Sequence, residues 1–390
     1  AGPAATPYGA PGAEPLATEP LPTALGGGVV GGVASPTAYL FAPARSGAAP
    51  LAFRLLASGY RVAVATDTVE AGGRLWPRGT FIVFTSRNAA SLGTTLDRLA
   101  RERGVPVTPV ASAYTERGQF GIGSSAVTAL KRPRVAVVGD EGLSQTAFGA
   151  LWWTMDRRWG VDFVHLNWAA LGSGDLGRFD VVVIPDGSPG AIGRSVGGEG
   201  LGRLKAWART GGTLVTMGGA TDWAARPDVD LTSARRVGGD TTSNAARPAA
   251  ADTAAPARGD LLAVTSPSAA PNTPASVPGA MFDAVLDRTH WLTFGYEQPR
   301  VTALVEGSTF LRLSREGNNV AVFPRTGAFT RAGFTWPDNT ERLLRNTALV
   351  VEEPLGRGHV VLFQNDPTFR GWVRSMDRLV LNAVLLGPSF

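Results

Sequence analysis

The sequence predicts an α/β protein in which a smaller α/β unit precedes a doubly wound, mainly parallel sheet. Two observations lead to this fold class. Between residues 133 and 223, short apolar runs alternate with segments of helical periodicity, and parallel strands need such crossover connections. Glycine pairs such as Gly211-Gly212 and Gly218-Gly219 follow these segments, where a helix or a strand must stop.

The elements of the larger unit follow from local signals. Val181-Val182-Val183-Ile184 is typical of a strand buried on both faces. Ser144 is the expected N-cap of a helix that reaches about Trp159, with Phe148, Leu151, Trp152, Met155 and Trp159 on its apolar stripe. Further helices are expected at 199–210 and 373–386. The expected strands span residues 134–138, 161–166, 180–185, 213–217, 301–305, 309–313, 320–323, 348–351 and 359–363.

Composition divides the chain into domains and linkers. Residues 1–35 are expected to form a Pro/Gly-rich tether and residues 36–131 a small α/β domain. Residues 132–390 are expected to form the larger α/β domain, with a low-complexity insertion at 238–280. The tether and the insertion hold few large apolar residues, so neither is expected to offset the entropy of ordering by itself.

Composition also excludes several classes of function. The 390 residues contain no cysteine and three histidines, and His165, His290 and His359 lack zinc-ligand spacing, so we expect no metal and no cofactor. The 37 basic and 32 acidic residues give a net charge of +5 without a basic, aromatic-rich cluster. No apolar run reaches the roughly 18 residues of a membrane span. Nucleic acid and a membrane span are therefore not expected.

Polar residues gather where the predicted parallel strands end, and ligands bind at this edge in such folds. Met217 ends the strand 213–217, where enzymes with a strand–turn–helix elbow carry their nucleophile, and a thioether is no nucleophile. We therefore assign no catalytic residue and interpret Met217 as a degenerate nucleophile position. The candidate ligand-binding residues are Asp140, Glu141, Asp186, Gly187, Gly218, Gly219, Asp222, Asn365, Asp366, Arg370 and Trp372.

The glycine turns at this edge predict a pocket whose backbone amides accept a carboxylate or a carbonyl of the ligand. Arg370 and Trp372 would add a positive charge and a stacking face. A peptide C-terminus suits this chemistry. The alternative is that Arg370 forms a structural ion pair with Asp366 or Asp186.

The order of the motifs resembles a known family. It is carried by Pro133-Arg134-Val135-Ala136-Val137-Val138-Gly139, by 180–187, by Gly356-Arg357-Gly358-His359 and by Asp366-Pro367-Thr368-Phe369-Arg370-Gly371. Residues 133–223 and 285–388 resemble the class I glutamine amidotransferase-like domain, a flavodoxin-like fold, which follows the peptidase domain in some bacterial zinc carboxypeptidases of the carboxypeptidase A type. Residues 36–131 resemble the segment that joins the two domains.

Two departures from the family bear on activity. The His-x-x-Glu zinc ligands of the peptidase are absent, and the amidotransferase triad is replaced by Met217 and by Gln364-Asn365-Asp366. The resemblance thus implies a non-catalytic accessory region of a secreted metallocarboxypeptidase-like protein. It would dock on or stabilise an upstream peptidase domain, or assemble with other copies of itself, and peptide is a possible ligand.

Two other functions stay open. One is a cysteine-independent hydrolase that uses carboxylates at the carboxyl edge of the sheet. The other is a structural subunit that self-assembles at the cell surface. All three readings expect a bacterial protein that is secreted, periplasmic or on the cell surface, and the absence of cysteine is compatible with export.

Overall fold

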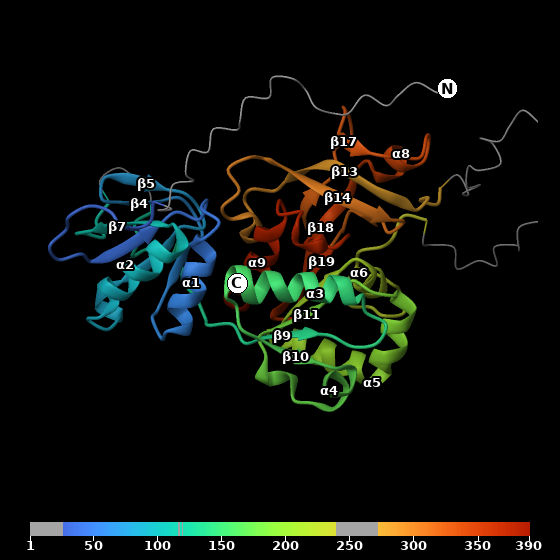
Figure 1. The fold of residues 1–390 in the computed structure, drawn as a ribbon, viewed down its shortest axis with the longest axis horizontal. Helices are drawn as coiled ribbons and strands as arrows, with labels where there is room; N and C mark the ends of the chain where they lie inside the picture. Colours follow the sequence, from blue (N-terminus) through green and yellow to red (C-terminus); the bar gives the residue numbers. More distant parts are fainter. Residues whose placement is uncertain (1–25, 116–117, 119, 239–271) are drawn as a thin grey trace, which may run out of the picture.

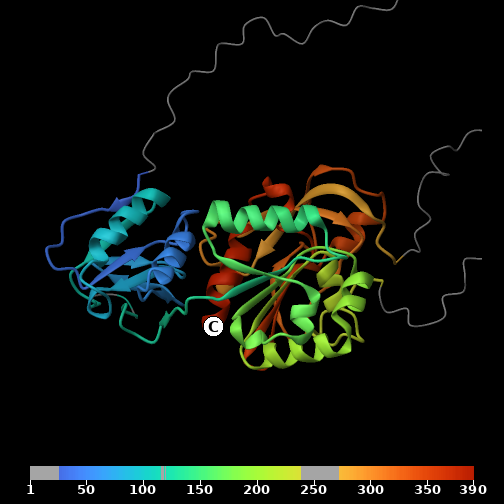
Figure 2. The ribbon, with the colours of Figure 1, turned by 60° about the horizontal axis from the view of Figure 1, so that its bottom comes forward.

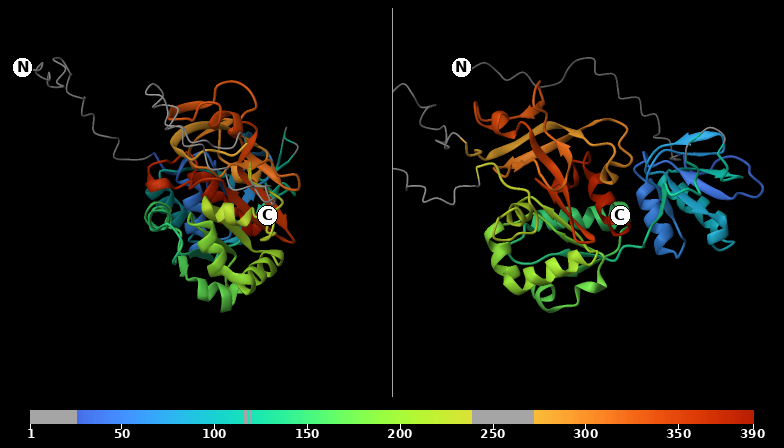
Figure 3. Two further views of the ribbon diagram at one scale, coloured as in Figure 1. Left: turned by 90° about the vertical axis from the view of Figure 1, so that its right-hand side faces the viewer. Right: turned by 180° about the vertical axis from the view of Figure 1, so that it is seen from behind.

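The computed structural model describes residues 26–115, 118, 120–238 and 272–390, which form two α/β units. The two units lie side by side, with the smaller N-terminal one next to the end of the chain (Figures 1 and 3). Each unit has its own sheet, and a third, two-stranded sheet belongs to the smaller unit.

The N-terminal unit is a six-stranded mixed sheet covered by two helices. Its strands are in the order β1-β7-β2-β6-β3-β8. Strand β1 lies inside the predicted tether and pairs in parallel with β7, whereas residues 1–25 lie outside the described residues. The elements are β1 Gly28–Val29, β2 Ala38–Phe41, α1 Ala48–Ala57, β3 Ala63–Ala65, β4 Val69–Ala71, β5 Arg74–Trp76, β6 Phe81–Phe84, η1 Thr85–Arg87, α2 Leu92–Arg103, β7 Pro106–Val110 and β8 Val127–Ala129.

The C-terminal unit contains the larger sheet and most of the helices. Its elements up to the predicted insertion are β9 Val135–Val138, α3 Gln145–Trp153, the π-helical turn η2 Thr154–Trp159, β10 Phe163–Leu166, α4 Trp168–Ser173, η3 Leu176–Arg178, β11 Val181–Ile184, α5 Pro189–Arg209, β12 Thr213–Met217 and α6 Gly219–Ala224. Those after it are β13 Val277–Leu286, η4 Trp291–Thr293, β14 Arg300–Gly307, β15 Leu311–Arg312, β16 Asn318–Val322, β17 Thr330–Gly333, α8 Thr340–Leu344, β18 Thr347–Leu355, β19 Gly358–Phe363, η5 Phe369–Gly371, α9 Asp377–Leu386 and η6 Gly387–Ser389.

The larger sheet is mixed, so the prediction of a mainly parallel sheet is corrected. Strands β10-β9-β11-β12-β19 run parallel to one another, and the path then continues through β18-β16-β13-β14 with antiparallel pairs. The change of direction occurs at the turn Gly356-Arg357 between β18 and β19, and two residues are too few for a parallel crossover. Gly356 has φ +67, which favours glycine at this turn.

Helices cover both faces of the parallel half. Val135 and Val137 of β9 pack with α3 and α9, and the alternating Ala136 and Val138 pack with α4, α5 and α6. Figure 2 shows the strands between α3 on one side and α5 on the other. The structure is therefore a mixed α/β fold with helices on both faces of these strands, and the doubly wound, mainly parallel arrangement predicted from the sequence is not confirmed for the sheet.

The two units share one hydrophobic core. Leu51 and Leu55 of α1 belong to the same buried cluster as Leu379 and Val380 of α9. The Arg378 guanidinium donates to the backbone carbonyls of Pro43 and, at 2.7 Å, of Ala44 in the N-terminal unit. Burial lowers the pKa of Arg378, which is consistent with a cation held between the units.

Three local expectations differ from the structure. The predicted insertion 238–280 runs into β13, which begins at Val277, and residues 239–271 lie outside the described residues. The helix predicted at 199–210 begins at Pro189 and is interrupted at Gly197, whose φ is +62. Trp152 of the predicted buried stripe is 52% exposed, whereas Leu151, Met155 and Trp159 are buried.

Candidate functional site

A cavity of about 370 Å³ lies where the carboxyl ends of β11, β12 and β19 meet the end of β14. We call it the rim pocket. It contains seven of the predicted site residues: Asp186, Gly187, Gly218, Gly219, Asp222, Asn365 and Asp366. The rest of its lining is Ser144, Thr146, Ala147, Pro189, Glu306, Gly307, Ser308, Thr309, Gln364 and Phe369.

The sharp elbow after β12 is centred on Gly218, not on Met217. Gly218 has φ 53 and ψ −119 and is the N-cap residue of α6. Met217 is 1% exposed and packs in the core that β12 shares with α9, because alternate side chains of a strand point to the same face. The position interpreted as a degenerate nucleophile is therefore a core position, and the strained position next to the pocket carries no side chain.

Asp186 fills the space that a side chain at Gly218 would need. A Cβ atom built on Gly218 would overlap Oδ1 of Asp186. The same Oδ1 accepts hydrogen bonds from the backbone N–H of Gly187 at 2.9 Å and of Gly219 at 2.6 Å. These amides were expected to bind a carboxylate of the ligand. They are instead occupied by a carboxylate of the chain itself.

Two further carboxylates face Asp186 across the pocket. Oδ1 of Asp366 accepts from the backbone N–H and the hydroxyl of Thr368, both at 2.8 Å. Burial raises the pKa of Asp366 to about 6, although the two hydrogen bonds from Thr368 lower it. The charges of Asp186 and Glu306 add to the rise. Burial also raises the pKa of Glu306, with Arg370 acting against it. The pocket therefore holds carboxylates whose charged forms are poorly compensated.

A chain of amide hydrogen bonds fixes the orientation of Gln364. The Glu306 backbone carbonyl accepts from Nδ2 of Asn365 at 2.8 Å, so Oδ1 of Asn365 is the atom that faces Gln364. Nε2 of Gln364 donates to it at 3.1 Å. Oε1 of Gln364 is then left buried with no hydrogen-bond partner in the described part of the chain.

Asp222 lines the pocket but is compensated. It is 7% exposed and forms an ion pair with Arg236 at 2.9 Å. Burial raises its pKa, and Arg236 and Arg226 oppose the rise. Asp222 therefore holds Arg236, which lies two residues before the predicted insertion.

Asp140 and Glu141 lie outside the rim pocket. The Asp140 carboxylate accepts from the backbone N–H of Trp168 and of Glu141, both at 2.8 Å, and the bond from Trp168 is the main cause of its lowered pKa. The Glu141 carbonyl accepts from Nε1 of Trp168 at 2.9 Å. Both residues thus anchor the start of α4 to the end of β9.

Arg370 and Trp372 are exposed and do not line the pocket. Arg370 has φ +49, and its guanidinium lies 5.2 Å from the centre of the Phe369 ring. Within the described residues it forms no ion pair with Asp366 or Asp186, the alternative weighed for it. Trp372 is 60% exposed. Neither side chain supplies the carboxylate-binding group that the sequence suggested.

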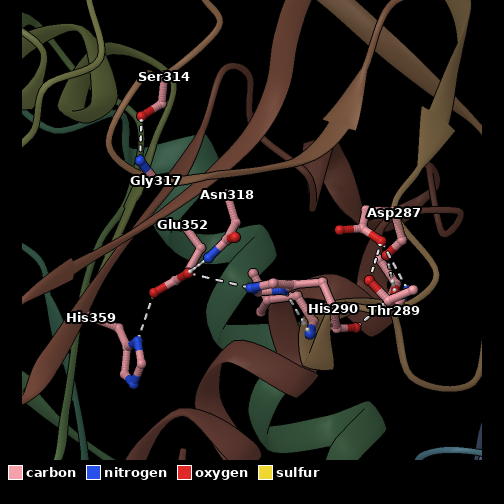
Figure 4. A network of polar contacts seen from close by, with 10 residues as sticks. Asp287, Thr289, His290, Ser314, Gly317, Asn318, Glu352 and His359 are labelled. Atoms are coloured by element: carbon pink, nitrogen blue, oxygen red, sulfur yellow. Dashed lines mark hydrogen bonds and ion pairs between the residues drawn. The ribbon is translucent and has the colours of Figure 1, made fainter.

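The histidines are engaged in hydrogen bonds, as Figure 4 shows for two of them. His359 Nδ1 lies 2.7 Å from Oε1 of Glu352, and His290 Nε2 lies 3.3 Å from its Oε2. Nδ2 of Asn318 donates to the same Oε2 at 2.7 Å. The third, His165, bonds through Nε2 to the Gly139 carbonyl at 2.6 Å. Each of the three histidines thus takes part in a hydrogen bond within the described part of the chain.

The described residues offer neither a metal-binding group nor a membrane-spanning helix. No group of three or more His, Asp or Glu side chains in those ranges has the arrangement of a metal site. No helix there combines the length and the apolar character that crossing a membrane requires.

Three kinds of pocket residue were not predicted from the sequence. Glu306 is the next-to-last residue of β14 in the antiparallel half, Ser144 and Thr146 lie at the N-terminus of α3, and Gln364 follows β19. The signal for Glu306 was its place after a predicted strand, in Glu306-Gly307-Ser308-Thr309. That signal becomes informative only when the position of β14 in the sheet is known.

No family model matches this chain, and no curated protein sequence matches it. Among solved structures, a glutamine amidotransferase from Thermotoga maritima is 10% identical over 65% of this chain and 96% of that chain, with a TM-score of 0.37. A putative ThuA-like protein from Parabacteroides merdae is 12% identical over 66% and 89%, with a TM-score of 0.41. A cytoplasmic protein from Salmonella typhimurium is 12% identical over 64% and 97%, with a TM-score of 0.38. These TM-scores are too low to carry an argument, and the comparisons add no support for a carboxypeptidase parent.

Proposed function

We propose that this chain is a non-catalytic binding module that holds its ligand in the rim pocket. The elbow at Gly218 carries this proposal. An elbow enzyme needs a nucleophile and free amide donors for the oxyanion, and here Asp186 occupies both the side-chain space and the amides of Gly187 and Gly219. The cavity itself is retained beside this elbow, which supports binding.

An accessory role extends this proposal. The sequence resemblance supports a place beside an upstream peptidase domain in a secreted metallocarboxypeptidase-like protein of a bacterium. In that setting a peptide segment is a suitable ligand, because the module would hold it near the peptidase. Docking, stabilisation of the peptidase and assembly with further copies are the roles that the resemblance allows.

A cysteine-independent hydrolase is the second candidate, and one observation favours it. Asp366, with its pKa raised to about 6, lies among the carboxylates of the rim pocket. A carboxyl group that titrates near neutral pH next to other carboxylates is the arrangement from which general acid–base pairs are built.

Binding and turnover are separated by one experiment. Short peptides with an acidic, a neutral or a basic central residue are titrated against the protein, with binding followed by backbone NMR shifts and peptide integrity by mass spectrometry. Ser308→Trp fills the pocket, and Ser195→Trp is the control on the exposed face of α5.

We expect saturable shifts at the rim pocket for at least one peptide class, abolished by Ser308→Trp, kept by Ser195→Trp, and with the peptide intact. Cleavage of a peptide would favour the hydrolase instead. If none of the three peptide classes binds, the proposal of a binding module is wrong.

A further inference from the structure

We infer that the rim pocket binds a cationic group rich in hydrogen-bond donors, a guanidinium or an ammonium. This inference rests on the proposed function and names the chemistry of its ligand. The residues that line the pocket include no Lys, Arg or His, while Asp186, Glu306 and Asp366 all contribute carboxylates to it. They come from three separate elements, the ends of β11, β14 and β19, so the acidic character is not one local run of sequence.

The buried acceptor of Gln364 is the independent observation that points to a ligand. Its side chain is 0% exposed, it lines the pocket, and Oε1 has no partner within the described residues. A buried acceptor without a partner destabilises the folded state, because it has lost its hydrogen bond to water without gaining another. A ligand that brings an N–H into the pocket relieves this cost, whereas a ligand that brings only acceptors does not.

Two of the carboxylates keep one oxygen for the ligand. Asp186 and Asp366 each use Oδ1 in hydrogen bonds to the chain. Their Oδ2 atoms have no hydrogen-bond partner among the described residues. Donors are thus needed at several points around one cavity, and a guanidinium offers five N–H donors in one plane while an ammonium offers three.

A positive charge fits the electrostatics of the pocket better than a neutral polar group. Asp366 is faced by Asp186 from the end of β11, by Glu306 from β14 and, through Glu306, by Arg370 from η5. Burial is the main cause of the raised pKa of Asp366 and of Glu306, and repulsion by Asp186 adds to both, with Glu306 also acting on Asp366. A bound cation removes this repulsion, so it binds more tightly as the pH rises through about 6 and Asp366 loses its proton.

Isothermal titration calorimetry with matched probes tests the inference. L-argininamide and its isostere L-citrullinamide, which has a neutral urea, are both used with the α-amino group acetylated, so that the guanidinium is the only charged group in the pair. We expect L-argininamide to bind roughly tenfold or more tightly than L-citrullinamide, because hydrogen bonds to charged groups are the stronger ones. Its affinity should rise between pH 5 and pH 7.

Variants locate the binding. Glu306→Gln, Asp366→Asn and Gln364→Leu should each weaken L-argininamide binding by roughly tenfold. Glu199→Gln removes the same charge from an exposed position on α5 and should leave the affinity unchanged. Circular dichroism of each variant checks that the fold is kept, and Glu306→Gln and Asp366→Asn keep the size of the side chain in case Gln364→Leu does not fold.

The outcomes distinguish this inference from the proposed function. If L-citrullinamide binds equally well, or if an acidic peptide binds in the rim pocket, the inference of a cationic ligand is wrong. The proposal of a binding module would still hold. If no probe of any charge binds, both fail. Two further probes distinguish the possible sources of a bound cation: spermidine stands for a free polyamine, and acetyl-Gly-Arg-Gly-amide stands for a peptide side chain. Tight binding of either probe supports the inference.

Discussion

Two carboxylates close to β19 have opposite character. Glu352 of the paired strand β18 bonds to His359 of β19, and burial, which would raise its pKa, is outweighed by hydrogen bonds from His290, His359 and Asn318, so that the pKa falls to about 2. Beyond the end of β19, Asp366 has a pKa raised to about 6.

The contrast shows that, for two carboxylates whose pKa is raised by burial, the hydrogen-bond donors and neighbouring charges decide whether the net pKa shift is downward or upward. Glu352 is 2% exposed and is surrounded by donors, so its charge is part of the stable fold. Asp366 has two donors from Thr368 and otherwise faces acidic neighbours. Carboxylates whose oxygens all accept hydrogen bonds are expected to stabilise the fold. A cluster of carboxylates that lacks such donors is expected to be a ligand-binding site.

The largest effect is expected for Glu352→Ala. Removing this carboxylate leaves His290, His359 and Asn318 without their common acceptor, and we expect a loss of about 3–5 kcal/mol in the free energy of unfolding. Urea denaturation at pH 7 measures it. Glu316→Ala, at an exposed position, should change stability by no more than about 0.5 kcal/mol.

The pH dependence sharpens the same test. Because the folded pKa of Glu352 lies below its unfolded value, its contribution is present above pH ~4.5 and is lost as the pH falls toward about 2. The wild type should lose this stability on acidification, and the difference from Glu352→Ala should shrink. A constant difference across that range would contradict the assignment.

The second largest effect is expected for Gly218→Ala. The added Cβ meets the Asp186 carboxylate, and the backbone at φ 53 and ψ −119 is strained for any side chain, so a loss of about 2 kcal/mol or more is expected. Thermal unfolding measures it. Gly202→Ala is the matched control, since it has open space in α5 and should stabilise slightly. Equal behaviour of the two variants would show that the elbow is not constrained.

A smaller effect of opposite sign is expected for Asp366→Asn. The folded pKa of Asp366 is raised, so its contribution to stability is present below pH ~4 and is lost as the pH rises through about 6. The neutral amide avoids this loss and keeps an oxygen for Thr368, so the variant should be about 1–2 kcal/mol more stable at pH 8. Denaturation curves at pH 4 and pH 8 check it, and a variant that is less stable at pH 8 would refute it.

The smallest effect is expected for Asp186→Asn. Removing this charge lowers the repulsion on Asp366, so the pKa of Asp366 should fall toward its ordinary range. Carbon-detected NMR titration of the side-chain carboxyls follows it directly. Asp162→Asn, at an exposed position outside the rim pocket, should leave that titration unchanged.

Local signals in the sequence predicted the parallel half of the larger sheet well. The run Val181–Ile184 forms β11, the strand predicted at 213–217 is β12, and Ser144 caps α3 by accepting from the N–H of Ala147. Each of these features depends on neighbouring residues alone, on the burial of a β-branched run or on a hydroxyl at a helix start.

Strand β13 was missed for a physical reason. It begins with Val277-Pro278-Gly279, residues typical of a loop, and it forms because β14, β16 and β17 supply its hydrogen-bond partners. Because these partner strands come later in the chain, the sequence pattern within 277–286 does not predict the pairing. Strands were expected at 301–305, 320–323 and 348–351, where β14, β16 and β18 lie, but their antiparallel arrangement around β13, and with it the place of Glu306, could not be predicted from local pattern.

The sequence by itself determined the types of most elements, the residues that follow the parallel strands and the lack of a cysteine nucleophile, because these depend on local pattern and composition. Only the tertiary structure decided that the elbow lies at Gly218, that Asp186 occupies its amides, and that Glu306 joins the pocket. Hydrogen-bond partners and pKa values arise from groups that the fold brings together from distant strands. The chemistry of the rim pocket could therefore not be predicted from the order of its residues.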